Sequence, residues 1–324
     1  MSAVLDSNPP GLQKAIEAQE RHTQTIMTQP GVVGTAIGLR GDGKASVFIL
    51  TEGPLVGGLP DSLDGVPVQV RVTGKIYSRH HRTNHEGPGG GDTEDPIDPT
   101  TRFDRPVPIG VSTGHPSITA GTYGARVTDG SNVYALSNNH VYANENLASI
   151  DDPVIQPGTF DGGASPADDI GTLSDFEPID FLGNNTMDAA IALSSTVDLG
   201  NSTPSDGYGT PKSTTAAATL NMKVKKYGRT TGFTKGQVYL TNATVSVGYD
   251  TGVALFVGQI IITPGNFSAP GDSGSLIVVD GGKGRNKGDD RKPVGLLFAG
   301  SSTITIASPI DPILTRFGVT VDGD

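Results

Sequence analysis

Cysteine and tryptophan are both missing from this chain of 324 residues. Without cysteine there is no disulfide framework, no thiolate nucleophile and no Cys-ligated metal site. A chain without disulfides is typical of a reducing compartment, and residues 1–19 lack the basic start and apolar core of a secretory signal. We therefore expect a cytoplasmic protein, with secretion by another route left open.

Long apolar segments and a basic charge balance are missing as well. No run approaches the ~20 apolar residues that a membrane-spanning helix needs, so we expect no membrane partner. The formal net charge of −11 disfavours nucleic acid, because phosphate binding needs a basic face. His81 and His85 have a spacing that metal ligands can have, but no third ligand accompanies them. The Gly-rich segments lack a closing Gly-Lys-Ser/Thr, so we expect neither a metal nor another cofactor.

What the chain does have is many short apolar runs separated by turn residues, with 45 glycines and 23 prolines. This pattern predicts a mainly β protein. Residues 1–77 read as a small α+β unit, with a helix over 11–28, a hairpin of 32–39 and 45–50, and a half-buried strand over 66–72. Residues 78–107 are acidic and rich in Gly and Pro, which predicts a linker.

Residues 108–324 form the larger unit, in which the strand pattern is dense. The acidic stretch 151–180 is expected to be mostly loop, and a short helix is expected over 309–317 with Ser308 as its N-cap and Pro309 as its first residue. We expect strands at 118–128, 133–137, 189–193, 222–227, 237–247, 254–263, 276–279 and 294–298.

The sharpest local signal is Ser273, which stands between Asp272 and Gly274 just before an apolar strand. Gly271 and Gly274 permit unusual backbone dihedrals and close approach of a substrate. A serine presented on such a tight turn is a candidate nucleophile, although an ordinary loop has the same composition. Serine is a weak nucleophile and needs a base to activate it.

His140 is the best candidate for that base among six histidines. It follows an apolar strand and small polar residues, whereas His115 stands between Gly114 and Pro116 with no strand leading into it. A base needs a carboxylate to orient it. Asp188 directly precedes the apolar strand 189–193 and is our first choice, and Asp169 is held in reserve.

These motifs, in the order His140, Asp188 and Ser273, resemble the trypsin-like (chymotrypsin-fold) serine peptidases. Residues 109–127 and the segment from Tyr227 to Gly232 are similar to strands of that family, and the likeness is greatest to a cytosolic bacterial group with plant narrow-leaf-type relatives. The resemblance covers about residues 108–320. It implies two β-barrels with the triad between them, so the expected fold is two β-barrels preceded by a small α+β N-terminal domain.

The resemblance also implies roles for further residues. The backbone N–H groups of Gly271 and Ser273 would hold an oxyanion, and a polypeptide substrate would pair with the edge formed by Phe298, Ala299, Gly300 and Ser301. Phe267 occupies the position where a carboxylate would select Arg or Lys, so it implies a preference for uncharged, small to medium apolar side chains. Nothing at the start of this barrel resembles the zymogen switch of the animal enzymes, which leaves the role of Asp272 open.

Two other functions share these motifs. A catalytically silent binding or scaffold protein can keep a peptidase fold, because fold alone does not fix function. An esterase can use the same triad. The unit 1–77 is too small to bury much core alone, so we expect it to pack on the larger unit or on another subunit, which leaves a homo-oligomer possible. There it would regulate access to the site, assist folding or dock a partner.

Overall fold

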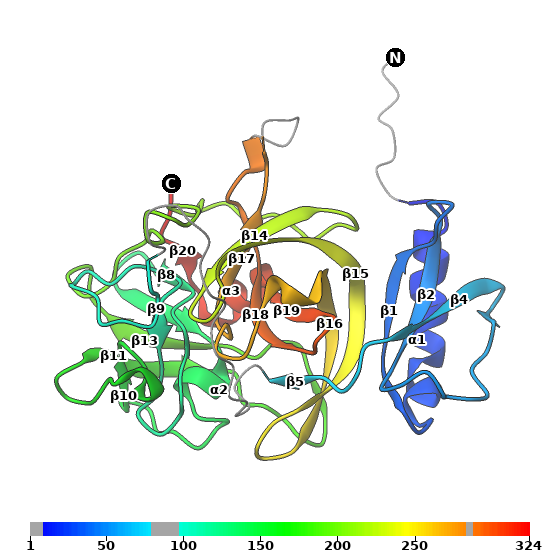
Figure 1. Cartoon of the computed structure of the whole chain (residues 1–324), viewed down its shortest axis with the longest axis horizontal. Helices are drawn as coiled ribbons and strands as arrows, with labels where there is room; N and C mark the ends of the chain where they lie inside the picture. The colour runs from blue at the N-terminus through cyan, green and yellow to red at the C-terminus, as the bar shows by residue number, and fades with distance from the viewer. Residues whose placement is uncertain (1–8, 79–96, 283–287) are drawn as a thin grey trace.

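The protein is mainly β, and the described part of the chain contains three α-helices (Figure 1). The structure, a computed structural model, describes residues 9–78, 97–282 and 288–324. The helices are α1 (Leu12–Met27), α2 (Asn139–Tyr142) and α3 (Ile310–Phe317). The larger unit also contains the 3₁₀ turns Thr159–Asp161 and Gly265–Phe267.

The N-terminal unit packs α1 on a small sheet. Its strands are β1 (Val32–Leu39), β2 (Ala45–Thr51), β3 (Ser62–Leu63) and β4 (Val66–Val72). The expected hairpin is present, with Ala36 opposite Phe48. Ala15 and Ala18 of α1 are fully buried against Ile37, because small side chains let the helix approach the sheet closely. The half-buried face expected for 66–72 is buried only at Val66, because β4 lies near the sheet edge beside β2 and β3.

The first half of the larger unit is built around a sheet of six strands. Its order is β10-β11-β13-β9-β8-β20, and the bridge between Gly114 and Ile155 links the β10 end to the small β6–β7 pair. Its core includes Tyr123, Leu173 and Ala190. The strands are β6 (Ser112–Thr113), β7 (Gly121–Thr122), β8 (Ala125–Thr128), β9 (Val133–Ser137), β10 (Pro153–Ile155), β11 (Asp169–Phe176), β12 (Asn184–Asn185), β13 (Ala190–Ser194) and β20 (Thr320–Val321). Of these, β12 pairs with β16 of the second half.

The second half closes on itself. Its six strands pair in the order β16-β19-β18-β17-β14-β15, and β15 pairs back with β16, so the hydrogen bonds form a closed ring. Closure leaves few free edges, and inward-facing side chains fill a ring of this size. The strands are β14 (Lys223–Gly228), β15 (Gly232–Gly248), β16 (Val253–Thr263), β17 (Leu276–Val279), β18 (Pro293–Gly300) and β19 (Thr305–Pro309).

The N-terminal unit joins this ring through its backbone. β1 pairs antiparallel with β15, with Gly34 opposite Val245, so one 12-stranded sheet runs from the ring into the N-terminal unit. In Figure 1, β1 stands beside β15, and α1 packs against β1 and β2. The buried amide of Gln19 exchanges hydrogen bonds with Asn242 of β15 at 2.7 and 3.0 Å. The small unit therefore packs on the larger one, as its size led us to expect.

Three sequence expectations need correction or limits. The stretch 151–180 is loop over most of its length, as expected, but it also contains β10 and β11, which the sequence did not predict. Pro309 is the N-cap of α3, and the Ser308 hydroxyl donates to Gln259 Oε1 at 2.8 Å instead of capping the helix. Of the expected linker 78–107, residues 79–96 lie outside the described residues, and so do His80, His81 and His85.

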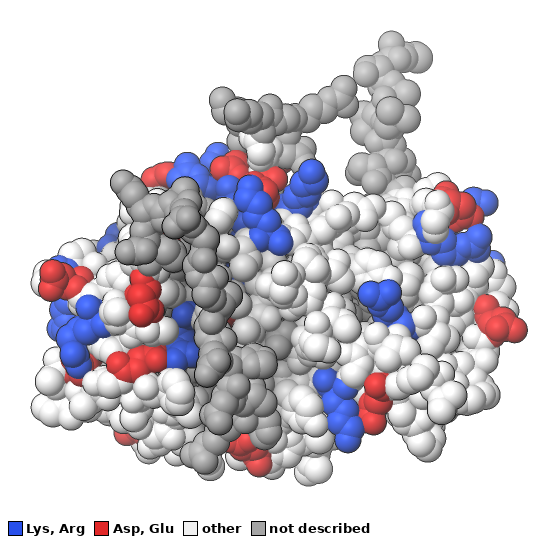
Figure 2. Space-filling view, in the orientation of Figure 1, with Lys and Arg blue, Asp and Glu red and all other residues white. Residues whose placement is uncertain are grey.

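Charged side chains on the face seen in Figure 2 lie in mixed acidic and basic groups over the described part of the chain. Many charged side chains of the protein form ion pairs, such as Arg316 with Asp175 at 2.8 Å. No helix among residues 9–78, 97–282 and 288–324 combines the length and the apolar character needed to cross a membrane.

Candidate active site

His140 and Asp188 form a fully buried pair in the first half of the larger unit. His140 lies in α2, directly after β9, and Asp188 lies two residues before β13, the strand that pairs with β9. The Nδ1 atom of His140 lies 2.5 Å from Asp188 Oδ2, and its backbone N–H donates to Asp188 Oδ1 at 3.3 Å. Neither side chain is exposed. A carboxylate held in this way orients the imidazole ring through one nitrogen.

Two further side chains fix the position of Asp188. The hydroxyl of Tyr249 donates to Asp188 Oδ2 at 2.8 Å, and the amide of Asn138 donates to the Asp188 carbonyl at 2.7 Å. Burial and the negative charge of Asp188 raise the pKa of Tyr249 well above its ordinary value. Tyr249 therefore stays protonated and acts as a donor. It comes from the turn between β15 and β16, so the closed ring contributes directly to the His140–Asp188 pair.

Ser273 lies on a tight turn between the two halves. The Ser273 carbonyl accepts a hydrogen bond from Thr122 N at 2.7 Å, and Ser137 Oγ donates to the Thr122 carbonyl at 2.8 Å, which joins this turn to β9 just before His140. A Cβ atom at Gly121 would lie 2.5 Å from Val141 and 3.2 Å from the Ser273 carbonyl, so both motifs flank one point. The Ser273 hydroxyl donates to the Phe298 carbonyl at 3.3 Å.

The backbone of this turn presents two amides. Gly271 and Gly274 have φ values of +98° and +94°, which favour glycine. The N–H groups of Asp272, Gly274 and Ser275 are hydrogen bonded to backbone carbonyls. For the N–H groups of Gly271 and Ser273, in contrast, no hydrogen-bond partner is found among the described residues. Two neighbouring amides of this kind can stabilise a negative oxygen.

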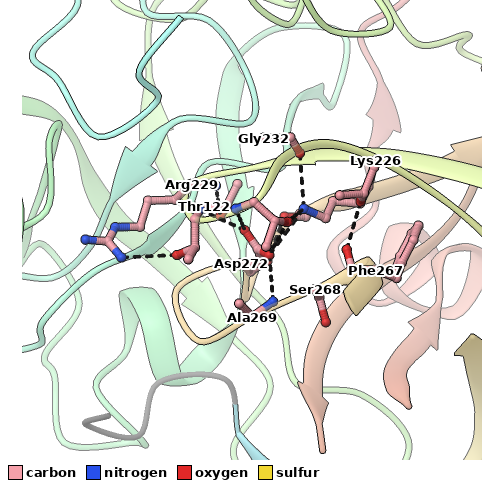
Figure 3. A network of polar contacts seen from close by, with 12 residues as sticks. Thr122, Lys226, Arg229, Gly232, Phe267, Ser268, Ala269 and Asp272 are labelled. Carbon is pink, nitrogen blue, oxygen red and sulfur yellow. Dashed lines mark hydrogen bonds and ion pairs between the residues drawn. The ribbon is translucent and has the colours of Figure 1, made fainter. Parts of the chain in front are cut away.

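Asp272 has an internal counter-ion, Lys226 of β14 (Figure 3). Both side chains are fully buried, and Lys226 Nζ lies 3.2 Å from Asp272 Oδ2. The carboxylate also accepts hydrogen bonds from the backbone of Thr230, Thr231 and Ala269. Burial opposes ionisation of Asp272, but the charge of Lys226 and these hydrogen bonds outweigh it and hold the pKa of Asp272 below its ordinary value. The network ties the turn 269–274 to β14 and to the segment after it.

The residues expected to contact substrate divide into two groups. Phe267 and Phe298 are buried in the ring; Phe267 belongs to its core, and the Phe298 ring lies 4.7 Å from that of Phe256. Ala299 and Gly300 form the end of β18, and Ser301, whose N–H donates to the Ile304 carbonyl at 2.9 Å, follows them. Ser268 and Thr305 hydroxyls meet beside Phe267 at 2.6 Å. The specificity expected from Phe267 stays a prediction.

Two buried residues escaped the sequence analysis. Lys226 follows Lys225 in the same strand. Neighbours on a strand face opposite sides, so one of these two lysines was expected to point inward. That pattern could have predicted a buried lysine. Tyr249 gave no such signal, because its contact with Asp188 joins segments 61 residues apart. The reserve candidate Asp169 begins β11, where its backbone pairs with Ile155, and Asp188 is the carboxylate that contacts the His140 ring.

No protein-family model and no curated protein sequence matches the chain. Among solved structures it is similar to Protease A from Thermobifida fusca (18% identity, TM-score 0.47, 67% of this chain and 98% of that one). It is also similar to a serine protease described as glutamic acid specific (22%, 0.48, 66% and 100%) and to a Cellulomonas bogoriensis chymotrypsin (18%, 0.45, 68% and 100%). These likenesses are distant, so neither activity nor specificity transfers from those proteins.

Proposed function

We propose that the protein is a serine endopeptidase of the trypsin-like fold, with His140, Asp188 and Ser273 as its triad. The observation that carries the proposal is the buried His140–Asp188 pair, 2.5 Å apart. It lies next to a serine on a glycine-flanked turn whose neighbouring amides have no partner among the described residues. The six strands closed into a ring and the separate six-stranded sheet of the first half also fit that fold.

The proposed reaction follows the triad template. Ser273 Oγ attacks the carbonyl carbon of the scissile peptide bond, and His140 takes the hydroxyl proton. The tetrahedral oxyanion accepts hydrogen bonds from the N–H groups of Gly271 and Ser273. His140 then returns the proton to the leaving amine, which leaves an acyl-enzyme at Ser273 that water hydrolyses by the same steps. Asp188 holds the imidazole and stabilises its charged form.

The polypeptide substrate is proposed to add as a strand to the edge at Phe298, Ala299, Gly300 and Ser301. No acidic side chain is at the position of Phe267, so we propose uncharged, small to medium apolar side chains before the scissile bond. Strong cleavage after Arg or Lys in a peptide library would contradict this specificity.

The test of the triad uses a fluorophosphonate probe and a peptide library on the full chain. We expect the probe to label Ser273, and Ser273→Ala to lose both labelling and hydrolysis while its circular dichroism spectrum is unchanged. His140→Ala should lose on the order of 10⁴-fold or more in turnover, because triad residues act as a unit. Asp188→Asn should be severely impaired and Asp169→Asn near normal; the reverse result would refute the assignment of Asp188.

A silent scaffold on the same fold would give no probe labelling with any variant, including the unmodified chain. Hydrolysis of short acyl esters without hydrolysis of peptides would point to an esterase that uses the same three residues. Each outcome is read in the same two assays, so the three functions are separable.

A further inference from the structure

The cleft edge that we propose for substrate is already paired with a segment of this chain. β5 (Tyr77–Ser78) runs antiparallel to β18, with Tyr77 opposite Gly300 and Ser78 opposite Ala299. On its other side Tyr77 pairs with Gly248 of β15, whose N–H donates to the Ile76 carbonyl at 2.9 Å. In Figure 1, β5 leaves the N-terminal unit and extends to the middle of the molecule.

The direction of β5 is that of a bound peptide substrate. The step from Tyr77 to Ser78 moves the pairing from Gly300 to Ala299, that is, toward Phe298. The Phe298 carbonyl is the acceptor for the Ser273 hydroxyl at 3.3 Å. The backbone of β5 therefore advances toward the nucleophile along the β18 edge, as an added substrate strand would.

The side chains of this segment alternate between buried and exposed, as those of a strand packed on one face do. Ile76 is 2% exposed, Tyr77 is 42% exposed and Ser78 is 5% exposed. Ile76 belongs to the apolar cluster that includes Tyr249 and Phe298. Just before this segment, the Thr73 carbonyl accepts a hydrogen bond from the Thr303 hydroxyl at 3.2 Å. This bond anchors the start of the segment beside β19.

We propose that Ile76–Ser78 is a built-in substrate mimic that fills the subsites before the scissile bond and restricts access of peptides to them. This proposal rests on the proposed peptidase function. It also defines a substrate class, namely extended peptides. Such a peptide would have a branched aliphatic residue at the position of Ile76, a residue that faces solvent at the position of Tyr77, and a small residue at the position of Ser78.

The restriction follows from connectivity. A short tether gives an effective concentration on the order of 1 mM, so a segment with a dissociation constant of about 0.1 mM would leave the edge free in only about one molecule in ten. Peptides that need the β18 edge are then hindered about tenfold. A small electrophile that reaches only Ser273 is not hindered, because it makes no use of that edge.

The first experiment replaces the segment by Ile76→Gly, Tyr77→Gly and Ser78→Gly together. The matched control is Pro54→Gly with Leu55→Gly, in an exposed turn of the same unit. We expect hydrolysis of a tetrapeptide amide of the stated class to rise about tenfold in the triple variant only, with an unchanged rate of fluorophosphonate labelling. Ser78→Trp, which adds bulk at a buried position and leaves Ile76 in place, should act in the same direction. Unchanged peptide hydrolysis in both variants would overturn the proposal.

The second experiment does not depend on catalysis. A fluorescent synthetic peptide of residues 73–78 is titrated into Ser273→Ala with and without the triple glycine replacement, beside a scrambled peptide. We expect at least tenfold tighter binding to the form with the replacement and none of the scrambled peptide. Equal binding to both forms, or binding to neither, would overturn the mimic. A failure of the peptidase function shows differently, as loss of labelling and hydrolysis in every form that keeps Ser273.

Discussion

At the scale of single residues, the His140–Asp188 pair is supported by a donor from the other half of the molecule. Tyr249 reaches Asp188 from the turn between β15 and β16. Glu145 holds this turn in place, because its carboxylate accepts hydrogen bonds from the backbone N–H groups of Asp250 and Thr251 at 3.2 and 2.9 Å. In the proposed triad, Tyr249 would therefore be a positioning residue that acts on the imidazole through Asp188.

Tyr249→Phe should lower kcat about tenfold with KM unchanged, because a hydrogen bond to a carboxylate contributes about 1.5–3 kcal/mol and a tenfold change corresponds to about 1.4 kcal/mol. The measurement is the pH profile of kcat/KM, in which we expect a displaced limb as well as a lower plateau. Tyr239→Phe is the control, because no hydrogen bond of its hydroxyl is found among the described residues. If Tyr249→Phe keeps the full kcat and an unchanged pH profile of kcat/KM, Tyr249 contributes only packing.

The Lys226–Asp272 pair makes the free energy of unfolding depend on pH in the acid range. The folded pKa of Asp272 lies below its ordinary value of about 3.9. Its ionisation therefore stabilises the fold above about pH 4, and this contribution is lost as pH falls through the lowered pKa. In urea unfolding below about pH 4, the unmodified chain should lose stability more steeply than Lys226→Met with Asp272→Asn.

The single variant Lys226→Met checks the same pair at neutral pH. It leaves a buried carboxylate without its counter-ion, so it should lose about 3–5 kcal/mol of unfolding free energy. Parallel acid profiles of the double variant and the unmodified chain would contradict a coupled role for Asp272.

At the scale of elements, the contact between β1 and β15 depends on a close approach at Gly34. A Cβ atom there would lie 2.6 Å from the Thr244 carbonyl oxygen, a backbone atom that cannot move aside cheaply. Gly34→Val should therefore separate the two strands and increase proteolytic cleavage of the N-terminal unit under native conditions. Gly41→Val is the control, because no atom lies within 4 Å of its Cβ position. Equal protease resistance of both variants would show that the strand contact does not hold the unit.

The sequence predicted elements well where local pattern decides them. The hairpin of β1 and β2 alternates around a turn of Gly41, Asp42 and Gly43, and β9 and β17 have the bounds expected from their apolar runs. It missed β11, whose acidic residues Asp169 and Asp175 look like loop but lie on a half-exposed strand. It also missed β5, because two residues carry no periodicity and their pairing with β18 is set by the fold of distant segments.

At the scale of the whole molecule, the site is assembled from both halves and from the N-terminal unit. The first half supplies His140 and Asp188, and the closed ring supplies Ser273, Tyr249 and Lys226. The N-terminal unit supplies β5, which pairs with β18. The triad candidates could be found from sequence because each sits in its own short motif. Their shared environment could not, because it is made of contacts between segments far apart in the chain.

The continuous sheet also has a thermal consequence. Hydrogen bonds between β1 and β15 make the small unit and the ring parts of one sheet, so melting either one exposes a strand edge of the other. We expect a single endotherm in differential scanning calorimetry, with the calorimetric enthalpy equal to the van't Hoff enthalpy. Gly34→Val should split it into two transitions. Heat would then detach the N-terminal unit only as the whole sheet melts, so warming the unmodified chain should not produce a folded ring that has lost its small unit.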